Sequence, residues 1–243
     1  MHRSYVIEPQ AAKDKIILAL DVPSRSDALR LVDQLGGEVR WFKIGLQLFC
    51  AEGPAFVREL RGAGANVFLD LKLHDIPQTV RHAVQTVIGM GVQMLTIHLL
   101  GGTEMCMAAV TGRSTADALL LGVTVLTSLT DDDLRETGFR TVVEDEVLLL
   151  GNLAKSAGIP GLVASPKEVA VLRKHYGSYF TIVTPGVRPV WAEPGDQKRF
   201  VTPAEAIQAG ADYLVIGRPI HGASKPIEAL RRVIEEVEAA DAV

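Results

Sequence analysis

The amino-acid sequence alternates short apolar segments with longer amphipathic ones, and this alternation limits the possible folds more than any other feature. It predicts eight strands, at residues 16–21, 40–45, 66–72, 93–98, 118–127, 161–165, 180–185 and 213–217. Amphipathic segments predict helices at residues 24–35, 52–64, 77–91, 144–158, 166–177, 202–210 and 225–240. Nearly continuous apolar strands that alternate with helices favour a parallel sheet covered by helices. The fold class is therefore α/β, with a (β/α)8 TIM barrel favoured over an open doubly wound sheet.

Length and composition agree with one barrel domain. The chain has 243 residues, of which 48% are hydrophobic, and this is enough apolar material for the core of one barrel. We assign residues 16–243 to the barrel and residues 1–15 to an N-terminal extension of unknown role. The net charge is −4 and no stripe of Lys and Arg occurs. We therefore expect neither a nucleic-acid partner nor a membrane partner.

Cysteine usage and the N-terminal segment both bear on the compartment. Cys50 and Cys106 occur in apolar or helical segments, without the spacing of a disulfide framework or a metal site. Residues 1–15 lack the apolar stretch of a signal peptide, and 18 consecutive apolar residues occur nowhere. These features predict a cytoplasmic protein.

Polar residues recur at the C-terminal ends of the predicted strands. They are Asp21, Lys43, Asp70, Lys72, His98, Thr127, Ser165, and Gly217 with Arg218. Barrel enzymes carry their chemistry on this face, and a purely structural barrel has little reason to place ionisable groups there. The pattern predicts an active site at the C-terminal ends of the strands.

The charges on the second and third strands form the strongest motif. Asp70 and Lys72 are two residues apart on a strand, so we expect their side chains on the same face. A self-neutralising buried ion pair would explain these two alone, but it would not explain Lys43 and Asp21 on the preceding strands. The alternation of Asp and Lys suits a lysine cation that donates a proton or faces a developing negative charge.

Asp75 and the neighbouring histidines have structural explanations. Asp75 precedes Ile76, Pro77 and Gln78 in a pattern close to a helix capping box. His74 and His98 have the character of ordinary loop or core histidines. The spacing of His, Asp and Glu does not resemble a metal site, and neither a Ser/His/Asp signature nor GxGxxG is present.

The segments after the last two strands predict an anion site. Residues 185–199 form a Pro/Gly-rich segment with Arg188 and Gln197, and Gly217 and Arg218 open a helix after the eighth strand. Phosphate-binding barrels use these two places, where backbone N–H groups and guanidinium groups match phosphate oxygens. The alternative is an ordinary surface loop. A long loop without periodicity is also a candidate lid.

Together these motifs resemble the orotidine 5′-monophosphate decarboxylase family from about residue 16 to residue 235. The family signature D-x-K-x-x-D-I-P-x-T is present from Asp70 to Thr79. The flanking motifs follow in order as LALD, FKIG, TVLTS, TPGVRP, GDQ and VIGRP. One departure is HLLGG, where Leu99 and Leu100 replace small residues, and we expect a local packing difference there.

The resemblance implies a homodimer that converts orotidine 5′-monophosphate to UMP and CO2 without a metal or an organic cofactor. It implies that Lys72 delivers a proton to C6, that Asp70 lies near the departing carboxylate, and that Lys43 completes the charged network and contacts ribose. Asp75 and Thr79 would reach the site of the partner subunit. The implied substrate-binding residues are Asp21 for ribose, Thr127 for the pyrimidine, and Arg188, Gln197, Gly217 and Arg218 for the pyrimidine edge and the phosphate.

Three other functions stay open on the sequence. A Mg²⁺-dependent sugar-phosphate decarboxylase of the same superfamily shares D-x-K-x-x-D, but the I-P-x-T continuation and the loop with PGVRP and GDQ favour the nucleotide enzyme. A non-catalytic nucleotide-phosphate binding barrel would not need Lys72 between two carboxylates. A phosphosugar isomerase barrel would need a Glu or His base at a strand end, and no Glu stands out there.

Overall fold

The computed structural model describes residues 9, 11–114, 117–192 and 201–242, and its strands form a closed parallel barrel. The strands are β1 (Ile16–Ala19), β2 (Trp41–Ile44), β3 (Asn66–Leu73), β4 (Met94–His98), β5 (Leu119–Val123), β6 (Gly161–Val163), β7 (Thr181–Pro185) and β8 (Tyr213–Ile216). Each strand pairs with its neighbour in sequence, and β8 pairs with β1 through Ile17 and Val215 to close the ring. The barrel expected from the sequence is confirmed, and the open sheet is excluded.

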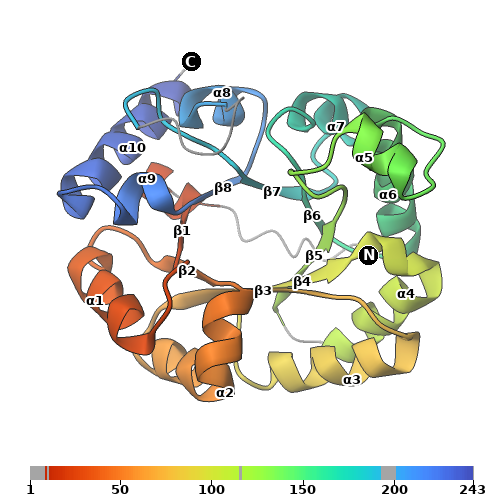
Figure 1. Cartoon of the computed structure of the whole chain (residues 1–243), viewed down its shortest axis with the longest axis horizontal. Coiled ribbons are helices and arrows are strands. Elements are labelled where there is room, and N and C mark those ends of the chain that lie inside the picture. Colours follow the sequence, from red (N-terminus) through yellow and green to blue (C-terminus); the bar gives the residue numbers. More distant parts are fainter. Residues whose placement is uncertain (1–8, 10, 115–116, 193–200, 243) are drawn as a thin grey trace.

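Helices surround the barrel on all sides (Figure 1). They are η1 (Ala12–Lys15), α1 (Arg25–Leu35), α2 (Leu46–Gly62), α3 (Pro77–Ile88), η2 (Leu99–Gly101), α4 (Gly102–Arg113), α5 (Asp131–Glu136), α6 (Val143–Ala157), α7 (Val169–Tyr176), α8 (Pro203–Gln208), α9 (Arg218–His221) and α10 (Pro226–Asp241). None of the helices in the described part of the chain has both the length and the apolarity to cross a bilayer.

Two apolar clusters account for the alternation of side chains along each strand. Ile17, Phe68 and Tyr213 belong to a small cluster inside the barrel. Their strand neighbours, such as Leu18 and Leu214, belong to the larger cluster between the strands and the helices. Because the strands are buried on both faces over most of their length, they contain apolar residues at most positions, as the sequence showed.

The structure corrects several of the expected boundaries. Helix α4 was not predicted, because its buried residues Met105, Cys106 and Ala109 are mixed with small residues and form no clear amphipathic stripe. Helix α2 begins at Leu46 instead of residue 52 and is interrupted at Gly53, where φ is 64°. Strand β5 ends at Val123, so Thr127 lies in the loop beyond it.

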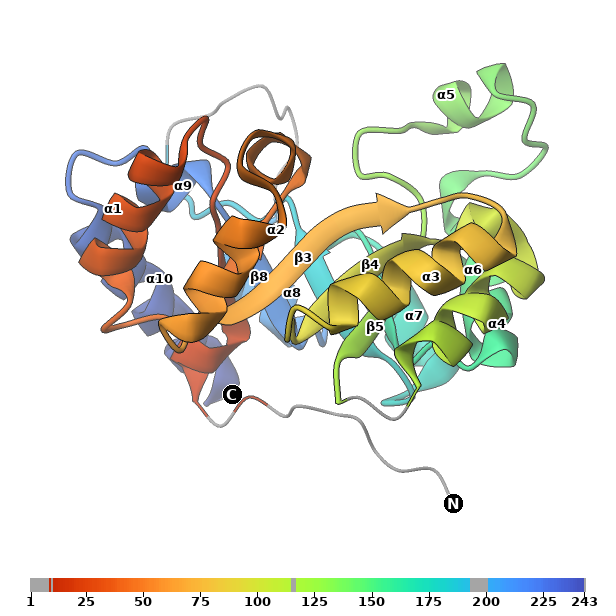
Figure 2. The same cartoon turned by 90° about the horizontal axis from the view of Figure 1, so that it is seen from below.

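The C-terminal ends of the strands carry the longest excursion from the barrel. In Figure 2, β3 rises from the lower left to its arrowhead in the upper half of the view, and α5 stands above the barrel at the upper right. The connection from β5 through α5 to α6 spans residues 124–142. This excursion and the segment after β7 border the same face of the barrel, which positions them around the site described below.

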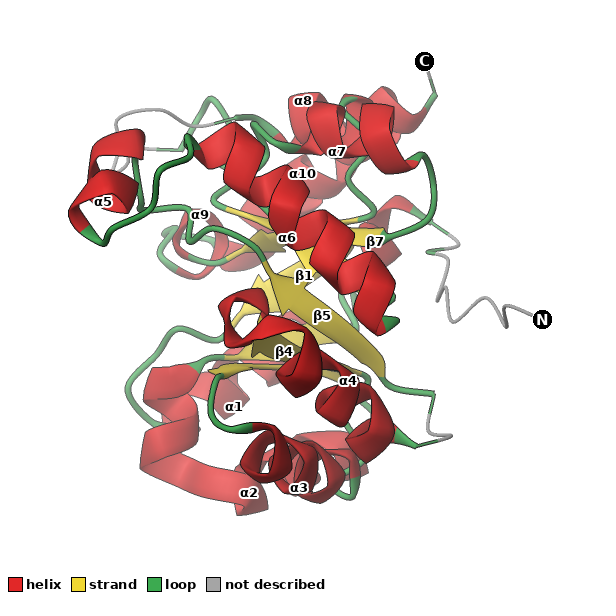
Figure 3. Cartoon of the chain, turned by 90° about the vertical axis from the view of Figure 1, so that its right-hand side faces the viewer, coloured by secondary structure: helices red, strands yellow, loops and turns green. Residues whose placement is uncertain are grey.

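Helices α3 and α4 lie side by side (Figures 2 and 3) and approach closely at one glycine. A Cβ on Gly112 would lie 2.4 Å from the backbone oxygen of Arg81. We expect Gly112→Ala to lower the free energy of unfolding by roughly 1–3 kcal/mol, because one helix must move away from the other. Denaturant-induced unfolding measures this change.

Gly62→Ala is the matched control for this substitution. An added Cβ on Gly62, in the last turn of α2, has no other atom within 4 Å. The free energy of unfolding of Gly62→Ala should stay unchanged or rise by up to about 1 kcal/mol, since alanine is a better helix former than glycine. Equal losses in both variants would contradict the close approach at Gly112.

Candidate active site

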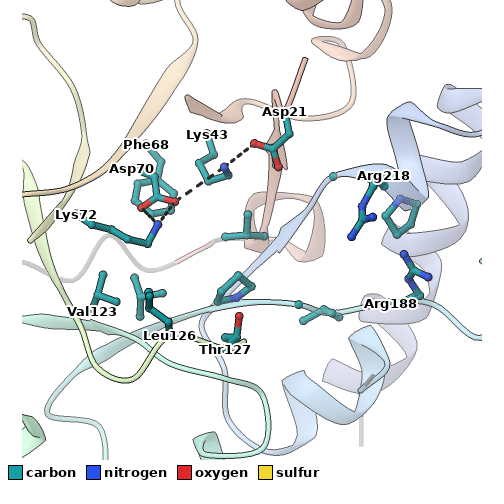
Figure 4. Close-up of a pocket in the computed structure, with 18 of the residues that line it drawn as sticks. Asp21, Lys43, Phe68, Asp70, Lys72, Val123, Leu126, Thr127, Arg188 and Arg218 are labelled. Carbon is teal, nitrogen blue, oxygen red and sulfur yellow. Dashed lines mark hydrogen bonds and ion pairs between the residues drawn. The ribbon is translucent and has the colours of Figure 1, made fainter. Parts of the chain in front are cut away.

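A cavity of about 270 Å³ opens at the C-terminal ends of the strands. Its polar lining comes from residues within or after six of the strands: Asp21, Lys43, Asp70, Lys72, Thr127, Arg188 and Arg218. Its apolar lining includes Phe68, Val123 and Val215. Figure 4 shows Asp70 and Lys72 on one side of the cavity and the two arginines on the other. The cavity therefore has two charged ends separated by an apolar middle.

Four charged side chains form a continuous array at one end. The Lys43 ammonium lies 2.8 Å from Asp21 Oδ1 and 3.9 Å from Asp70 Oδ2. The Lys72 ammonium donates to both oxygens of Asp70, at 2.8 and 2.9 Å. The side chains of Lys43 and Asp70 are only 11% and 15% exposed. Opposite charges therefore alternate along the array, and attraction is stronger at its buried centre than at Asp21 and Lys72, whose side chains are 52% and 31% exposed.

Lys72 reaches Asp70 by a route that the sequence did not predict. Its φ is 50°, a left-handed value that non-glycine residues rarely adopt. The register between β3 and β4 shifts between Leu69 and Leu73, so β3 is not regular at this point. The expected contact between Asp70 and Lys72 is present, but simple strand alternation is not its cause.

Thr96 belongs to this end of the site and was missed in the sequence. Its buried hydroxyl accepts from the backbone N–H of Lys72 at 2.8 Å and donates to Asp70 Oδ1 at 3.0 Å. The sequence did contain a signal, because Thr96 is a polar residue inside the apolar strand Met94–His98. Met94 belongs to the cluster inside the barrel, and a residue two positions along a strand faces the same side.

The two arginines mark the other end of the cavity. Arg188 is buried and follows β7, where its backbone N–H donates to the carbonyl of Val201. Arg218 begins α9 and is exposed. Both also border an adjoining hollow of about 720 Å³. Gln197 falls outside the described residues.

Gly217 lies beside the end of β1, close to the charged array. A Cβ at this position would lie 3.2 Å from the Cβ of Ala19 and 3.5 Å from the Asp21 carboxylate. The glycine thus allows β8 to approach β1 closely at the edge of the cavity. The close approach of Gly217 to Ala19 is one reason why a glycine precedes Arg218.

Asp75 and Thr79 do not line the cavity of their own chain. Both are exposed, beyond β3 and at the start of α3. The predicted capping box is wrong: Ile76 is the N-cap residue and no side chain caps the helix. The Asp75 carboxylate instead accepts from the N–H of Ile76 at 2.6 Å. Pro77 holds the residue before it in an extended conformation, which moves the start of the helix one residue beyond Asp75.

His98 packs beside the array. Its ring stacks on His74 with centroids 5.4 Å apart. Burial, followed by the nearby His74 and Lys72, lowers the pKa of His98 to about 4. His98 is therefore neutral at pH 7 and its Nδ1 accepts from the N–H of Leu100.

The unusual residues after His98 produce a specific packing arrangement. Leu99 is fully buried, whereas Leu100 is exposed. Leu99 packs on the backbone of Gly122 in β5, where a Cβ would come within 2.5 Å of the leucine side chain. The large side chain after β4 is thus accommodated by the absence of one on β5.

Glu168 is a buried carboxyl group that the sequence did not single out. Burial raises its pKa to about 7, and the carboxyl accepts from the N–H of Ser165 after β6. It does not border the cavity. Within the described residues, no group of three His, Cys, Asp or Glu side chains is placed to hold a metal ion.

A parallel barrel with ionisable side chains around a cavity at the C-terminal ends of its strands defines the class of (β/α)8 barrel enzymes. The orotidine 5′-phosphate decarboxylase / HUMPS family matches residues 14–233 of the chain. The chain belongs to this family.

Individual relatives give the same family assignment. Proteins named orotidine 5′-phosphate decarboxylase from Moorella thermoacetica and Syntrophotalea carbinolica are each 48% identical to the chain. The first match covers 93% of both proteins, and the second covers 94% of this chain and 97% of the relative. The crystal structure of orotidine 5′-phosphate decarboxylase from Lactobacillus acidophilus superposes with a TM-score of 0.82 at 35% identity, over 92% of this chain and 99% of that one.

The lowered pKa of His98 predicts a loss of stability in acid. Between pH 6.5 and about 4 the unfolded chain binds a proton at His98 that the folded chain does not bind. The free energy of unfolding should therefore fall through this range, with a contribution from His98 on the order of 2–3 kcal/mol. His98→Gln should lose less stability between pH 7.5 and pH 4.5 in denaturant titrations. Parallel pH curves for the two proteins would contradict this assignment.

Proposed function

We propose that this protein decarboxylates orotidine 5′-monophosphate to UMP and CO2 in pyrimidine nucleotide synthesis, without a metal or organic cofactor. The observation that carries the proposal is the array of Asp21, Lys43, Asp70 and Lys72 at one end of a cavity with two arginines at the other. The names of the relatives support the same activity.

Lys72 is the proton donor in this proposal. The bond between C6 and the carboxylate breaks, CO2 leaves, and the electron pair stays on C6. One N–H proton of the Lys72 ammonium then moves to C6, and the amine regains a proton from solvent. A fixed ammonium beside C6 stabilises the developing negative charge more than it stabilises the substrate, which is the condition for a faster chemical step.

The other members of the array place the substrate. Asp70 lies next to the departing carboxylate, and Lys43 and Asp21 contact the ribose. The ion pairs support these roles. They link Lys72, the proposed proton donor, through Asp70 and Lys43 to Asp21, the residue proposed to contact ribose.

The opposite end binds the rest of the nucleotide. Thr127 contacts the pyrimidine, and Arg188, Gln197, Gly217 and Arg218 hold the pyrimidine edge and the phosphate. Guanidinium groups match phosphate oxygens with paired hydrogen bonds, and the arginines face the array from across the cavity (Figure 4). Phosphate binding far from C6 supplies energy that orients the reacting carbon. Part of the candidate lid predicted at residues 185–199, from residue 193 onward, lies outside the described residues.

A homodimer with shared sites completes the proposal. Asp75 and Thr79 are exposed and outside their own cavity, which suits residues that reach the site of a second copy. Exposed apolar side chains lie on the same or neighbouring elements: Ile76 is 68% exposed, Met107 54% and Leu100 41%. Exposed apolar side chains on elements that pack together suit a protein interface. Residues 1–15 have no role in the proposal.

A cytoplasmic location fits the state of the cysteines. Cys50 is exposed and Cys106 is buried, and both are free thiols. Burial raises the pKa of Cys106 to about 11, so this thiol is unreactive. Free thiols of this kind are usual in a reducing compartment.

The alternative functions differ in what they need from the site. A sugar-phosphate decarboxylase that uses Mg²⁺ would lose its activity on chelation. An isomerase would need a Glu or His base at the cavity, and the described residues that line it include neither Glu168 nor any other Glu or His. A binding protein would retain affinity for the nucleotide without turnover.

The purified protein should convert orotidine 5′-monophosphate to UMP, followed by ultraviolet absorbance. Turnover should be unaffected by EDTA, because the lysine ammonium and not a metal stabilises the developing charge. Lys72→Ala should lower kcat by about 1,000-fold or more, since it removes both the proton donor and the cation. A pure wild-type protein without turnover would refute the proposed activity, and loss of turnover in EDTA would favour the Mg²⁺ enzyme.

Mixed dimers test the shared site. Lys72→Ala and Asp75→Asn subunits should each be nearly inactive alone and should regain part of the activity after subunit exchange. In each mixed dimer, one of the two sites takes both Lys72 and Asp75 from unmutated chains. Exchange is monitored by native mass spectrometry. If no activity is recovered after complete exchange, the proposal that Asp75 acts in the site of the partner subunit is wrong.

A further inference from the structure

Thr96 is the only residue of β4 that faces the irregular part of β3. Leu69 pairs with Leu95 and Leu73 pairs with Ile97, so three residues of β3 stand opposite Thr96 alone. Irregularities of this kind re-aim side chains next to active sites and leave ladder groups without their usual partners. The Lys72 N–H is such a group, and the Thr96 hydroxyl accepts from it at 2.8 Å.

The same hydroxyl also limits the rotation of the Asp70 carboxylate. It donates to Oδ1 at 3.0 Å, while the Lys72 ammonium donates to both oxygens and Lys43 approaches Oδ2. A carboxylate held from three directions has one favoured orientation. Thr96 thus connects the backbone of one charged residue to the side chain of the other.

The left-handed φ of Lys72 indicates that this residue needs support from its surroundings. A non-glycine residue stays in that conformation only where its surroundings hold it, and such residues cluster at functional sites. Thr124, a buried threonine just after β5, differs because its hydroxyl donates to the backbone carbonyl of Val163. Thr96 therefore differs from Thr124 in that its hydroxyl bonds to the backbone of one charged residue and to the side chain of another.

We propose that Thr96 is a positioning residue that sets the placement of Lys72 relative to Asp70 through its two hydrogen bonds. This inference rests on the proposed decarboxylation. Thr96 touches no substrate atom in the proposal, and it acts by holding the ammonium and the carboxylate in the arrangement that the chemical step needs.

Three substitutions test this role kinetically. Thr96→Val removes the hydroxyl and should lower kcat roughly 10- to 100-fold, the effect of a displacement near 1 Å at a reacting group, with KM changed less than about threefold. Thr96→Ser keeps the hydroxyl and should retain most of the wild-type kcat. Thr184→Val is the matched control in β7, where a buried hydroxyl has no hydrogen-bond partner among the described residues, and it should keep wild-type kinetics.

The outcomes separate positioning from packing. Wild-type kcat in Thr96→Val would overturn the inference, as would an equal loss in Thr96→Ser, because the methyl group would then be the part that matters. An equal loss in Thr184→Val would assign the effect to general disturbance of the barrel. If Thr96→Val does not fold, Thr96→Ala serves the same test with the same expected loss.

A crystal structure of Thr96→Val gives a readout that does not depend on activity. Lys72 should leave the left-handed region, and its ammonium should separate from Asp70. Retention of both features would overturn the inference even if the protein had no decarboxylase activity. Wild-type turnover is measured separately, so failure of the proposed function and failure of the Thr96 role are distinguishable.

Discussion

The hydrogen bonds between β1 and β8, which close the barrel, are the constraint on which the rest of the structure depends. Closure leaves no strand edge unpaired and brings the C-terminal ends of all eight strands to one face. Residues that are far apart in sequence then become neighbours. Asp21 and Gly217 lie at opposite ends of the chain, yet they meet where β1 and β8 pair. The site is a consequence of this closure, because no single strand supplies more than part of it.

Charge alternation makes such a site tolerable inside a protein. Ions removed from water lose several kcal/mol of solvation unless close partners and hydrogen bonds offset the loss. Lys43 lies between two carboxylates, and Asp70 lies between two ammonium groups. Each charge therefore compensates its neighbours. The arrangement that offsets the cost of burying these charges is the same one that presents an ammonium for the proposed chemistry.

Sequence reasoning succeeded where a feature depends on local periodicity. All eight strands were placed within a few residues, because burial on both faces leaves an apolar run that is easy to detect. It failed at α4, where small residues such as Ala109 and Gly112 pack against neighbours without a one-sided stripe. It also failed at Asp75, where the proline after Ile76 moved the helix start by one residue. Both failures arise from details that the hydrophobic pattern does not contain.

The sequence by itself determined the barrel, the order of the charged residues and the family to which they belong, because these follow from periodicity and from short motifs. Only the tertiary structure decided how Lys72 reaches Asp70. The left-handed φ of Lys72 and its bond to Thr96 arise from a register shift between β3 and β4, and the two residues are separated by 24 positions. A contact across that separation depends on how two strands pair, and neither strand specifies that pairing alone.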